Sequence, residues 1–239
     1  MYYLVEKIPV VMYFAGIFVV FYVVITFNLI YTINSELSVL FNLYIKGEKT
    51  EMKKEDFYPL DVAGVHRDLP ICKISDELSI AAFVLFGDVE LTESCATDLL
   101  KLAPEHDVII TAEAKGIPLV HEMTKQSGKN KYVVARKVVK LYMKEVFSVE
   151  LQSITTQKKQ KLFIDSDEAE FMRGKKVVIV DDVISTGESL RAVEKLVKKA
   201  GGEIVGRMAI LAEGDAQYRD DIIYLEKLPL ISSDGTPKK

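Results

Sequence analysis

Short apolar runs alternate with segments of helical spacing along the second half of the chain. The runs that predict buried strands cover residues 107–111, 132–135, 176–180, 203–211 and 222–225, and the helical segments cover residues 91–102, 117–126 and 188–200. Fully apolar strands that alternate with helices are typical of a parallel sheet buried on both sides. We therefore expect an α/β fold with an open, mostly parallel sheet and helices on both faces.

A different pattern lies at the N-terminus, where residues 8–33 carry no charge and are almost all apolar. A helix of this length rises about 39 Å, enough to cross a hydrocarbon layer of about 30 Å. A cleaved signal peptide would have a basic start and a small-residue cleavage site, and a buried helix of a globular domain would show a polar face. The segment has none of these features, so we predict one transmembrane helix that contacts the lipid bilayer through residues 8–33.

The lysines around this segment predict its orientation. Only Lys7 precedes it, and the lysines that follow it are Lys46, Lys49, Lys53 and Lys54. Because lysine-rich flanks stay on the cytoplasmic side, we predict a single-pass membrane protein with a cytoplasmic C-terminal domain. The expected organisation is a tail and transmembrane helix in residues 1–35, a stalk in residues 36–58, a folded domain in residues 59–230 and a flexible tail in residues 231–239.

Composition and charge narrow the class of the folded domain. The net charge of the chain is −4, whereas a nucleic-acid-binding protein would carry a basic excess, so we expect no nucleic acid partner. The two cysteines, Cys72 and Cys95, lack the spacing of a zinc site and do not suggest a disulfide framework. This cysteine usage fits a reducing compartment.

The residues that suggest chemistry concentrate in positions 177–190. An apolar strand there ends in Asp181 and Asp182, and a short loop leads into a helix at Thr186 and Gly187. Ligands of open α/β sheets bind beyond the carboxyl ends of the strands, and the free N–H groups of a helix N-terminus bind phosphate. Gly187 lets the backbone approach such a ligand closely. The hydroxyl groups that could add hydrogen bonds belong to Ser185, Thr186 and Ser189.

Two carboxylates beside a phosphate repel it unless they bind something else, such as sugar hydroxyls or Mg²⁺. A phosphate next to a diol describes ribose 5-phosphate. The alternative is an ordinary strand–turn–helix unit in which the aspartates and hydroxyl residues serve as turn and cap residues. A lone Asp-Asp pair would favour this alternative, but the whole pattern of residues 177–190 is more specific.

This segment, Val-Val-Ile-Val-Asp-Asp-Val-Ile-Ser-Thr-Gly-Glu-Ser-Leu, resembles the phosphoribosyl pyrophosphate (PRPP) loop of the type I phosphoribosyltransferases. The resemblance implies that Asp181 and Asp182 bind the ribose 2′- and 3′-hydroxyls. It also implies that the 5′-phosphate is bound by Ser185, Thr186, Gly187, Glu188 and Ser189. Glu188 stands where many members have glycine, and as a first-turn residue it suits the helix dipole if its side chain points away from the phosphate.

Two further segments are similar to the part of this family that binds pyrophosphate. Residues 111–118, Thr-Ala-Glu-Ala-Lys-Gly-Ile-Pro, follow a predicted strand and resemble its pyrophosphate loop, and Arg136-Lys137 resembles an Arg-Lys pair of the adenine and xanthine branches. Two adjacent cations at a strand end suit a diphosphate. By this resemblance the pyrophosphate-binding residues are Glu113, Ala114, Lys115, Gly116, Arg136 and Lys137.

The remaining matches concern the base and the lid. Residues 65–69, Val-His-Arg-Asp-Leu, resemble the hood segment of adenine phosphoribosyltransferases, which implies base contacts by Val65 and Arg67. Residues 144–156 and 159–165 predict a two-stranded arm around a basic turn, in the place of the family's flexible catalytic lid. Glu150 is the lid carboxylate that we single out, and the lysines of the turn also fit a solvated hairpin.

The resemblance implies a membrane-anchored purine phosphoribosyltransferase that uses PRPP, Mg²⁺ and an adenine- or xanthine-type base and forms a homodimer. Mg²⁺ would bind mainly through PRPP, with Asp181 and Asp182 as its protein ligands. The residues expected to act in catalysis are Asp181, Asp182, Lys115 and Arg136. The alternative is a PRPP-sensing regulatory module at the membrane that has lost catalysis, and pyrophosphate release would discriminate between the two.

Overall fold

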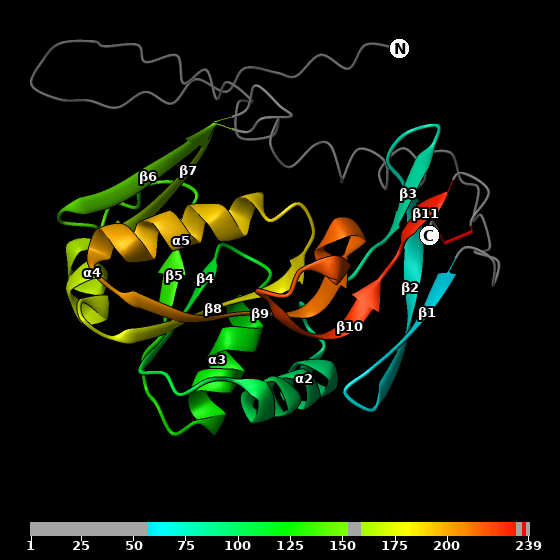
Figure 1. Cartoon of the computed structure of the whole chain (residues 1–239), viewed down its shortest axis with the longest axis horizontal. Helices are drawn as coiled ribbons and strands as arrows, with labels where there is room; N and C mark the ends of the chain where they lie inside the picture. The colour runs from blue at the N-terminus through cyan, green and yellow to red at the C-terminus, as the bar shows by residue number, and fades with distance from the viewer. Residues whose placement is uncertain (1–56, 153–158, 233–235, 238–239) are drawn as a thin grey trace, which may run out of the picture. The chain divides into compact units, whose positions relative to one another are not determined.

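The computed structural model describes residues 57–152, 159–232 and 236–237. Its centre is a five-stranded sheet (Figure 1). All neighbouring strands of this sheet are parallel, as predicted. Their order across the sheet is β10 (Ile223–Leu228), β9 (Glu203–Glu213), β8 (Lys176–Ile184), β4 (Val108–Ala112) and β5 (Val133–Ala135).

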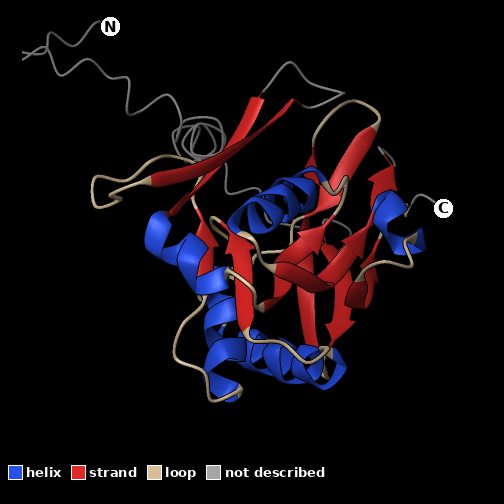
Figure 2. Cartoon of the chain, turned by 60° about the vertical axis from the view of Figure 1, so that its left-hand side comes forward, coloured by secondary structure: helices blue, strands red, loops and turns tan. Residues whose placement is uncertain are grey.

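Helices cover both faces of this sheet, which confirms the predicted α/β class (Figure 2). Successive side chains of a strand point to opposite faces, so Val108 and Ile110 belong to one buried core and Ile109 to the other. The core on one face contains apolar residues of α4 (Ser166–Met172) and α5 (Glu188–Ala200). The core on the other face contains residues of α2 (Val89–Leu102) and α3 (Ile117–Gln126).

Local sequence signals fix the ends of these helices. Asp88 caps α2 by accepting a hydrogen bond from the Leu91 N–H, and α5 ends at Gly201, which has the left-handed backbone that glycine favours. The short helix α4 was not predicted, although it has a capping box between Asp165 and Glu168. This Asp-x-x-Glu spacing was the available signal for its start.

The predicted two-stranded arm is confirmed as an antiparallel pair, β6 (Val146–Gln152) and β7 (Lys159–Asp165). Its base is joined to the end of β5, because Arg136 and Phe163 exchange two backbone hydrogen bonds of 2.8 Å. Leu162 and Ile164 are buried in the core beneath α5. The arm is therefore attached directly beyond β5, the strand that Arg136 and Lys137 follow (Figure 1).

A smaller antiparallel sheet, which we call the hood, contains the predicted hood segment of residues 65–69, but the sheet as a whole was not predicted. It consists of β1 (Phe57–Val62), β2 (Val65–Lys73), β3 (Leu78–Ala81) and β11 (Leu230–Ser232). Its first hairpin turns at Ala63 and Gly64, which both have positive φ, and alanine gives no sequence signal for such a turn. The hood therefore includes residues 57–58, which we expected in the stalk, and residues 231–232, which we expected in the flexible tail.

The localisation predicted above needs a correction. The expected transmembrane helix at residues 8–33 and most of the expected stalk lie outside the residues that the structure describes. No helix within the described ranges is long and apolar enough to cross a membrane. This finding stands against the predicted single-pass membrane location, which we withdraw.

Candidate active site

The carboxyl ends of β8 and β4 bring two of the predicted segments into contact. Gly116 begins α3 just beyond β4, and a Cβ atom at this position would overlap the Oγ1 of Thr111. The same Cβ would lie 3.3 Å from Oδ1 of Asp181 at the end of β8. Only glycine fits this contact without displacement, so the loop of residues 113–116 lies directly beside the aspartate pair.

Asp181 and Asp182 bring two carboxylates to this edge of the sheet. The Asp182 side chain is buried, and its Oδ2 has no hydrogen-bond partner among the described residues. The Asp182 N–H donates a 3.0 Å hydrogen bond to Oδ1 of Asp181. Burial and the neighbouring Asp182 carboxylate raise the pKa of Asp181 well above its ordinary range. Two buried carboxylates are costly without a compensating ligand, such as a hydroxyl donor or a cation.

The loop that follows β8 encloses a hollow of about 160 Å³, lined by Asp181 and residues 183–190. The N-terminus of helix α5 lies at this hollow. Its N-cap residue, Gly187, has φ +72° and no side chain to cap the first turn. Free N–H groups at a helix N-terminus bind phosphate. The predicted phosphate residues 185–189 all line this one hollow.

The loop after β4 is tied to the segment after β5 through Glu113. Its Oε2 accepts a 3.0 Å hydrogen bond from the Lys137 N–H, and its Oε1 lies 3.4 Å from Nζ of Lys140. Burial raises the pKa of Glu113, but these two partners outweigh it and hold the pKa below its ordinary range. The peptide bond to Ala114 is cis, and Ala114 and Lys115 are exposed. Glu113 therefore holds two loops together, while Lys115 is open to solvent.

Arg136 and Lys137 bring positive charge to the same edge. Nε of Arg136 is buried and has no partner in the described part of the chain. The charge of Lys137 acts on Asp181 and partly offsets the rise of its pKa. One buried guanidinium nitrogen of Arg136 and one buried carboxylate oxygen of Asp182, neither with a partner in the described ranges, thus lie at the ends of β5 and β8.

The two residues predicted to contact the base lie in the hood. Val65 is buried in the core that also contains α2. The Arg67 guanidinium donates hydrogen bonds of 2.7 and 2.9 Å to Asp88, one of 2.8 Å to Glu90 and one of 2.8 Å to the His66 carbonyl. These bonds use every nitrogen of Arg67 and fasten the hood to the start of α2. They do not connect it with the hollow at residues 183–190.

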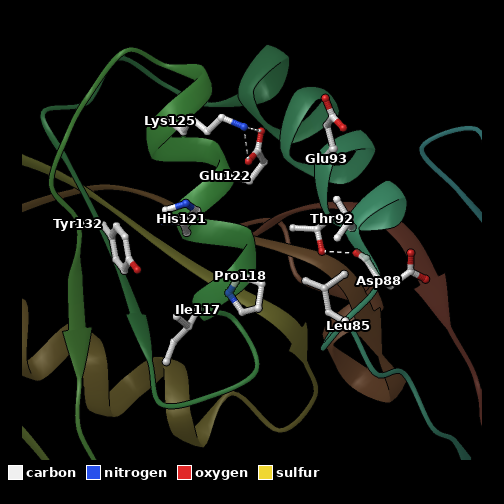
Figure 3. A pocket seen from close by; sticks show the side chains of 12 residues that line it. Leu85, Asp88, Thr92, Glu93, Ile117, Pro118, His121, Glu122, Lys125 and Tyr132 are labelled. Carbon is white, nitrogen blue, oxygen red and sulfur yellow. Dashed lines mark hydrogen bonds and ion pairs between the residues drawn. The ribbon is translucent and has the colours of Figure 1, made fainter.

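A larger hollow of about 350 Å³ lies between α2 and α3 (Figure 3). Apolar side chains such as Leu85, Ile117 and Tyr132 form much of its wall, with Glu122 and Lys125 paired at 3.2 Å on its rim. No residue predicted for the ribose, phosphate, pyrophosphate or base lines it. Of these two hollows, only the smaller and more polar one is lined by residues predicted to bind substrate.

One residue that lies against the loop after β8 was missed by the sequence analysis. Arg219, in the segment before β10, lies against the loop after β8, because a Cβ atom at Gly187 would be only 2.6 Å from its Nη1. It follows Gly187 by more than thirty positions, and no motif connects the two. Only the packing of the loop before β10 against the start of α5 reveals the contact.

Comparison with known proteins identifies the family. The family model of the phosphoribosyl transferase domain matches residues 93–234. A hypoxanthine/guanine phosphoribosyltransferase of Methanococcus voltae is 35% identical over 135 residues, which cover 56% of this chain and 68% of the relative. An adenine phosphoribosyltransferase of Thermotoga maritima is 41% identical over 110 residues, which cover 46% of this chain and 59% of the relative.

A solved structure supports the same conclusion. The adenine phosphoribosyltransferase of Thermoanaerobacter pseudethanolicus superposes with a TM-score of 0.51 at 28% identity, over 59% of this chain and 82% of that one. The chain described here belongs to the phosphoribosyltransferase family, and the aspartate pair, the predicted phosphate loop and both predicted pyrophosphate segments lie within the matched region. It is a phosphoribosyltransferase.

Proposed function

We propose that this chain transfers the 5-phosphoribosyl group from PRPP to a purine base and releases pyrophosphate. The observation that carries the proposal is the buried Asp182, whose Oδ2 lacks a described partner beside a second carboxylate and an uncapped helix N-terminus. This arrangement suits a sugar diol next to a phosphate. The adenine and hypoxanthine/guanine phosphoribosyltransferases among the relatives support a purine as the acceptor.

The reaction forms a bond from a base nitrogen to C1 of the ribose and breaks the bond from C1 to the pyrophosphate oxygen. The base loses the proton of the attacking nitrogen, and pyrophosphate leaves with the electron pair. Such chemistry depends on holding the reactants in line and on stabilising charge on the leaving group. Asp181 and Asp182 would hold the ribose hydroxyls, and residues 185–189 would bind the 5′-phosphate.

The leaving diphosphate would be held at the other end of the site. Lys115 and Arg136 supply its positive charge, together with Lys137. Gly116 allows the backbone to approach, because it lies closely against Thr111 and Asp181. Glu113 acts differently from the sequence prediction: its carboxylate is bonded to Lys137 and Lys140, so we propose that it positions the loop and does not bind pyrophosphate.

Mg²⁺ fits this donor set as a metal that the substrate brings. Within the described ranges, no group of three or more histidine, cysteine or acidic side chains could hold a metal ion. Magnesium usually binds one or two protein carboxylates together with substrate phosphates and water. Asp181 and Asp182 are the carboxylates that would hold it, and the ion would supply charge neutralisation at the diphosphate.

The test is pyrophosphate release by the full chain from PRPP and Mg²⁺, with adenine, hypoxanthine, guanine and xanthine supplied one at a time. We expect release with at least one base and thermal stabilisation of the protein by PRPP alone. Stabilisation without release for any base would contradict the transferase and indicate the sensor considered above. The absence of both effects would show that residues 181–189 do not bind PRPP. The homodimer remains a prediction, which sedimentation of the same protein tests.

A further inference from the structure

Arg219 adds a positive charge to the phosphate loop from outside the motif. It follows the short 3-10 helix of residues 214–218 and precedes β10. Nη1 of Arg219 is the closest atom to the position that a Gly187 Cβ would occupy, at 2.6 Å. Any side chain at residue 187 would therefore collide with the guanidinium. A larger residue at 187 would have to displace the guanidinium, in addition to the strain of its positive φ.

Asp221 fixes the orientation of this guanidinium. It accepts hydrogen bonds from Nε at 2.8 Å and from Nη2 at 2.7 Å, and Arg219 is only 28% exposed. The hydrogen bonds that Arg219 donates to Asp221 raise the pKa of Arg219, so the guanidinium stays charged. Nη1 alone has no acceptor among the described residues, and it is the nitrogen that faces Gly187.

The charge of the loop favours a further cation at this place. Residues 181–190 include Asp181, Asp182 and Glu188 but no lysine or arginine, and the next residue, Arg191, uses Nη2 to donate a 3.1 Å hydrogen bond to the Thr186 carbonyl. A phosphate dianion in the hollow would lie close to Asp181, and the partial positive charge of a helix N-terminus only partly offsets this repulsion. The Arg219 guanidinium beside Gly187 adds a full positive charge in a form suited to phosphate.

We propose that Arg219 binds the 5′-phosphate of PRPP through Nη1, and that Asp221 is the residue that positions it. This inference rests on the proposed function, because it assigns a residue to the same phosphate site. It predicts that Arg219 acts on one end of the substrate only. The ribose 5-phosphate end should depend on Arg219, and the pyrophosphate end, bound near Gly116 and Arg136, should not.

The experiment measures calorimetric dissociation constants of the full chain for ribose 5-phosphate and for pyrophosphate, each with Mg²⁺. We expect Arg219→Met to weaken ribose 5-phosphate by about 10- to 100-fold, as for loss of a charged hydrogen bond, and to change pyrophosphate by less than about 3-fold. Arg219→Lys should recover part of the loss. Arg173→Met is the matched control, because Arg173 also pairs with a carboxylate, Glu170 at 2.8 Å, in the turn after α4.

The outcomes separate this inference from the proposed function. If Arg219→Met binds ribose 5-phosphate like the wild type, the assignment of Arg219 is wrong and the proposed function stands. Equal losses for both ligands with a lower urea midpoint would show a structural role and also overturn it. A wild-type chain that binds neither PRPP nor ribose 5-phosphate would overturn the proposed function and Arg219 together.

Discussion

The loops after β8 and β4 are built from the same elements but hold their acidic groups differently. Each leaves a buried strand and enters a helix at a glycine. After β8, Asp182 keeps a buried oxygen without a described partner. After β4, the Glu113 carboxylate is bonded to Lys137 and Lys140. The Asp182 carboxylate in the first loop is therefore available to a ligand, whereas the Glu113 carboxylate in the second loop is already bonded to neighbouring residues.

Gly187 and Gly116, the glycines at the starts of the two helices, also differ in backbone conformation and in what they face. Gly187 has a left-handed backbone and faces the guanidinium end of the Arg219 side chain. Gly116 has an ordinary helical backbone, with φ −71°, and faces the buried Thr111. Changes in the first loop should therefore alter ligand binding with little effect on folding, whereas changes in the second should alter both.

Asp182→Asn should give the largest effect on activity. It removes a charge aimed at the ligand and leaves the packing unchanged, so we expect kcat/KM for PRPP to fall by about 100-fold or more. The unfolding midpoint in urea should stay at or above that of the wild type. Asp98→Asn, which breaks a surface pair with Lys101, is the control. Full activity in Asp182→Asn would refute the assignment of the aspartate pair.

Gly116→Ala should affect both activity and stability. The backbone of Gly116 suits alanine, so the cost comes from overlap with Thr111, about 1–3 kcal/mol in the free energy of unfolding. We expect PRPP affinity to fall as well, because the overlap displaces the loop from Asp181. In a Thr111→Ala background the same change should cost much less, and an unchanged cost in that double-mutant cycle would contradict the contact.

Glu113→Gln should have a smaller effect, confined to the pyrophosphate end. Glutamine keeps an acceptor for the Lys137 N–H but loses the charge pair with Lys140. This pair is partly exposed, so the loss of its interaction energy should have a modest effect. We expect KM for PRPP to rise by about 2- to 5-fold with kcat nearly unchanged. Glu122→Gln, whose partner Lys125 lies outside the site, serves as the control. Equal effects of both changes would argue against a positioning role for Glu113.

Asp181→Asn should show its effect in the pH dependence of stability. The pKa of Asp181 is raised in the folded state by burial and by Asp182, so the folded chain binds this proton more tightly than the unfolded chain. The wild type therefore loses stability as the pH rises above the ordinary aspartate pKa of about 3.9. Urea midpoints without ligand should be higher for Asp181→Asn at pH 7, and this gain should disappear near pH 4. A gain of equal size at both pH values would contradict the raised pKa.

The sequence predicted the parallel sheet and the strand–loop–helix unit that contains residues 177–190 well, because both depend on local patterns. The apolar run of β8 and the Asp-Asp and Ser-Thr-Gly residues after it are neighbours in the chain. The hood was missed, since its first hairpin turns at Ala63 and its last strand comes from the C-terminal end. Arg67 was expected at the base, but it is fully engaged with Asp88, Glu90 and a backbone carbonyl.

By itself the sequence determined which strand ends carry chemistry and which residue types they present. Only the tertiary structure decided which of these ends meet. Gly116 lies beside Asp181, Glu113 pairs with Lys140, and Arg219 lies against Gly187. The physical reason is that strand order fixes such contacts. Because β4 lies between β8 and β5, and β9 and β10 follow on the other side, residues from distant parts of the chain converge on one edge of the sheet.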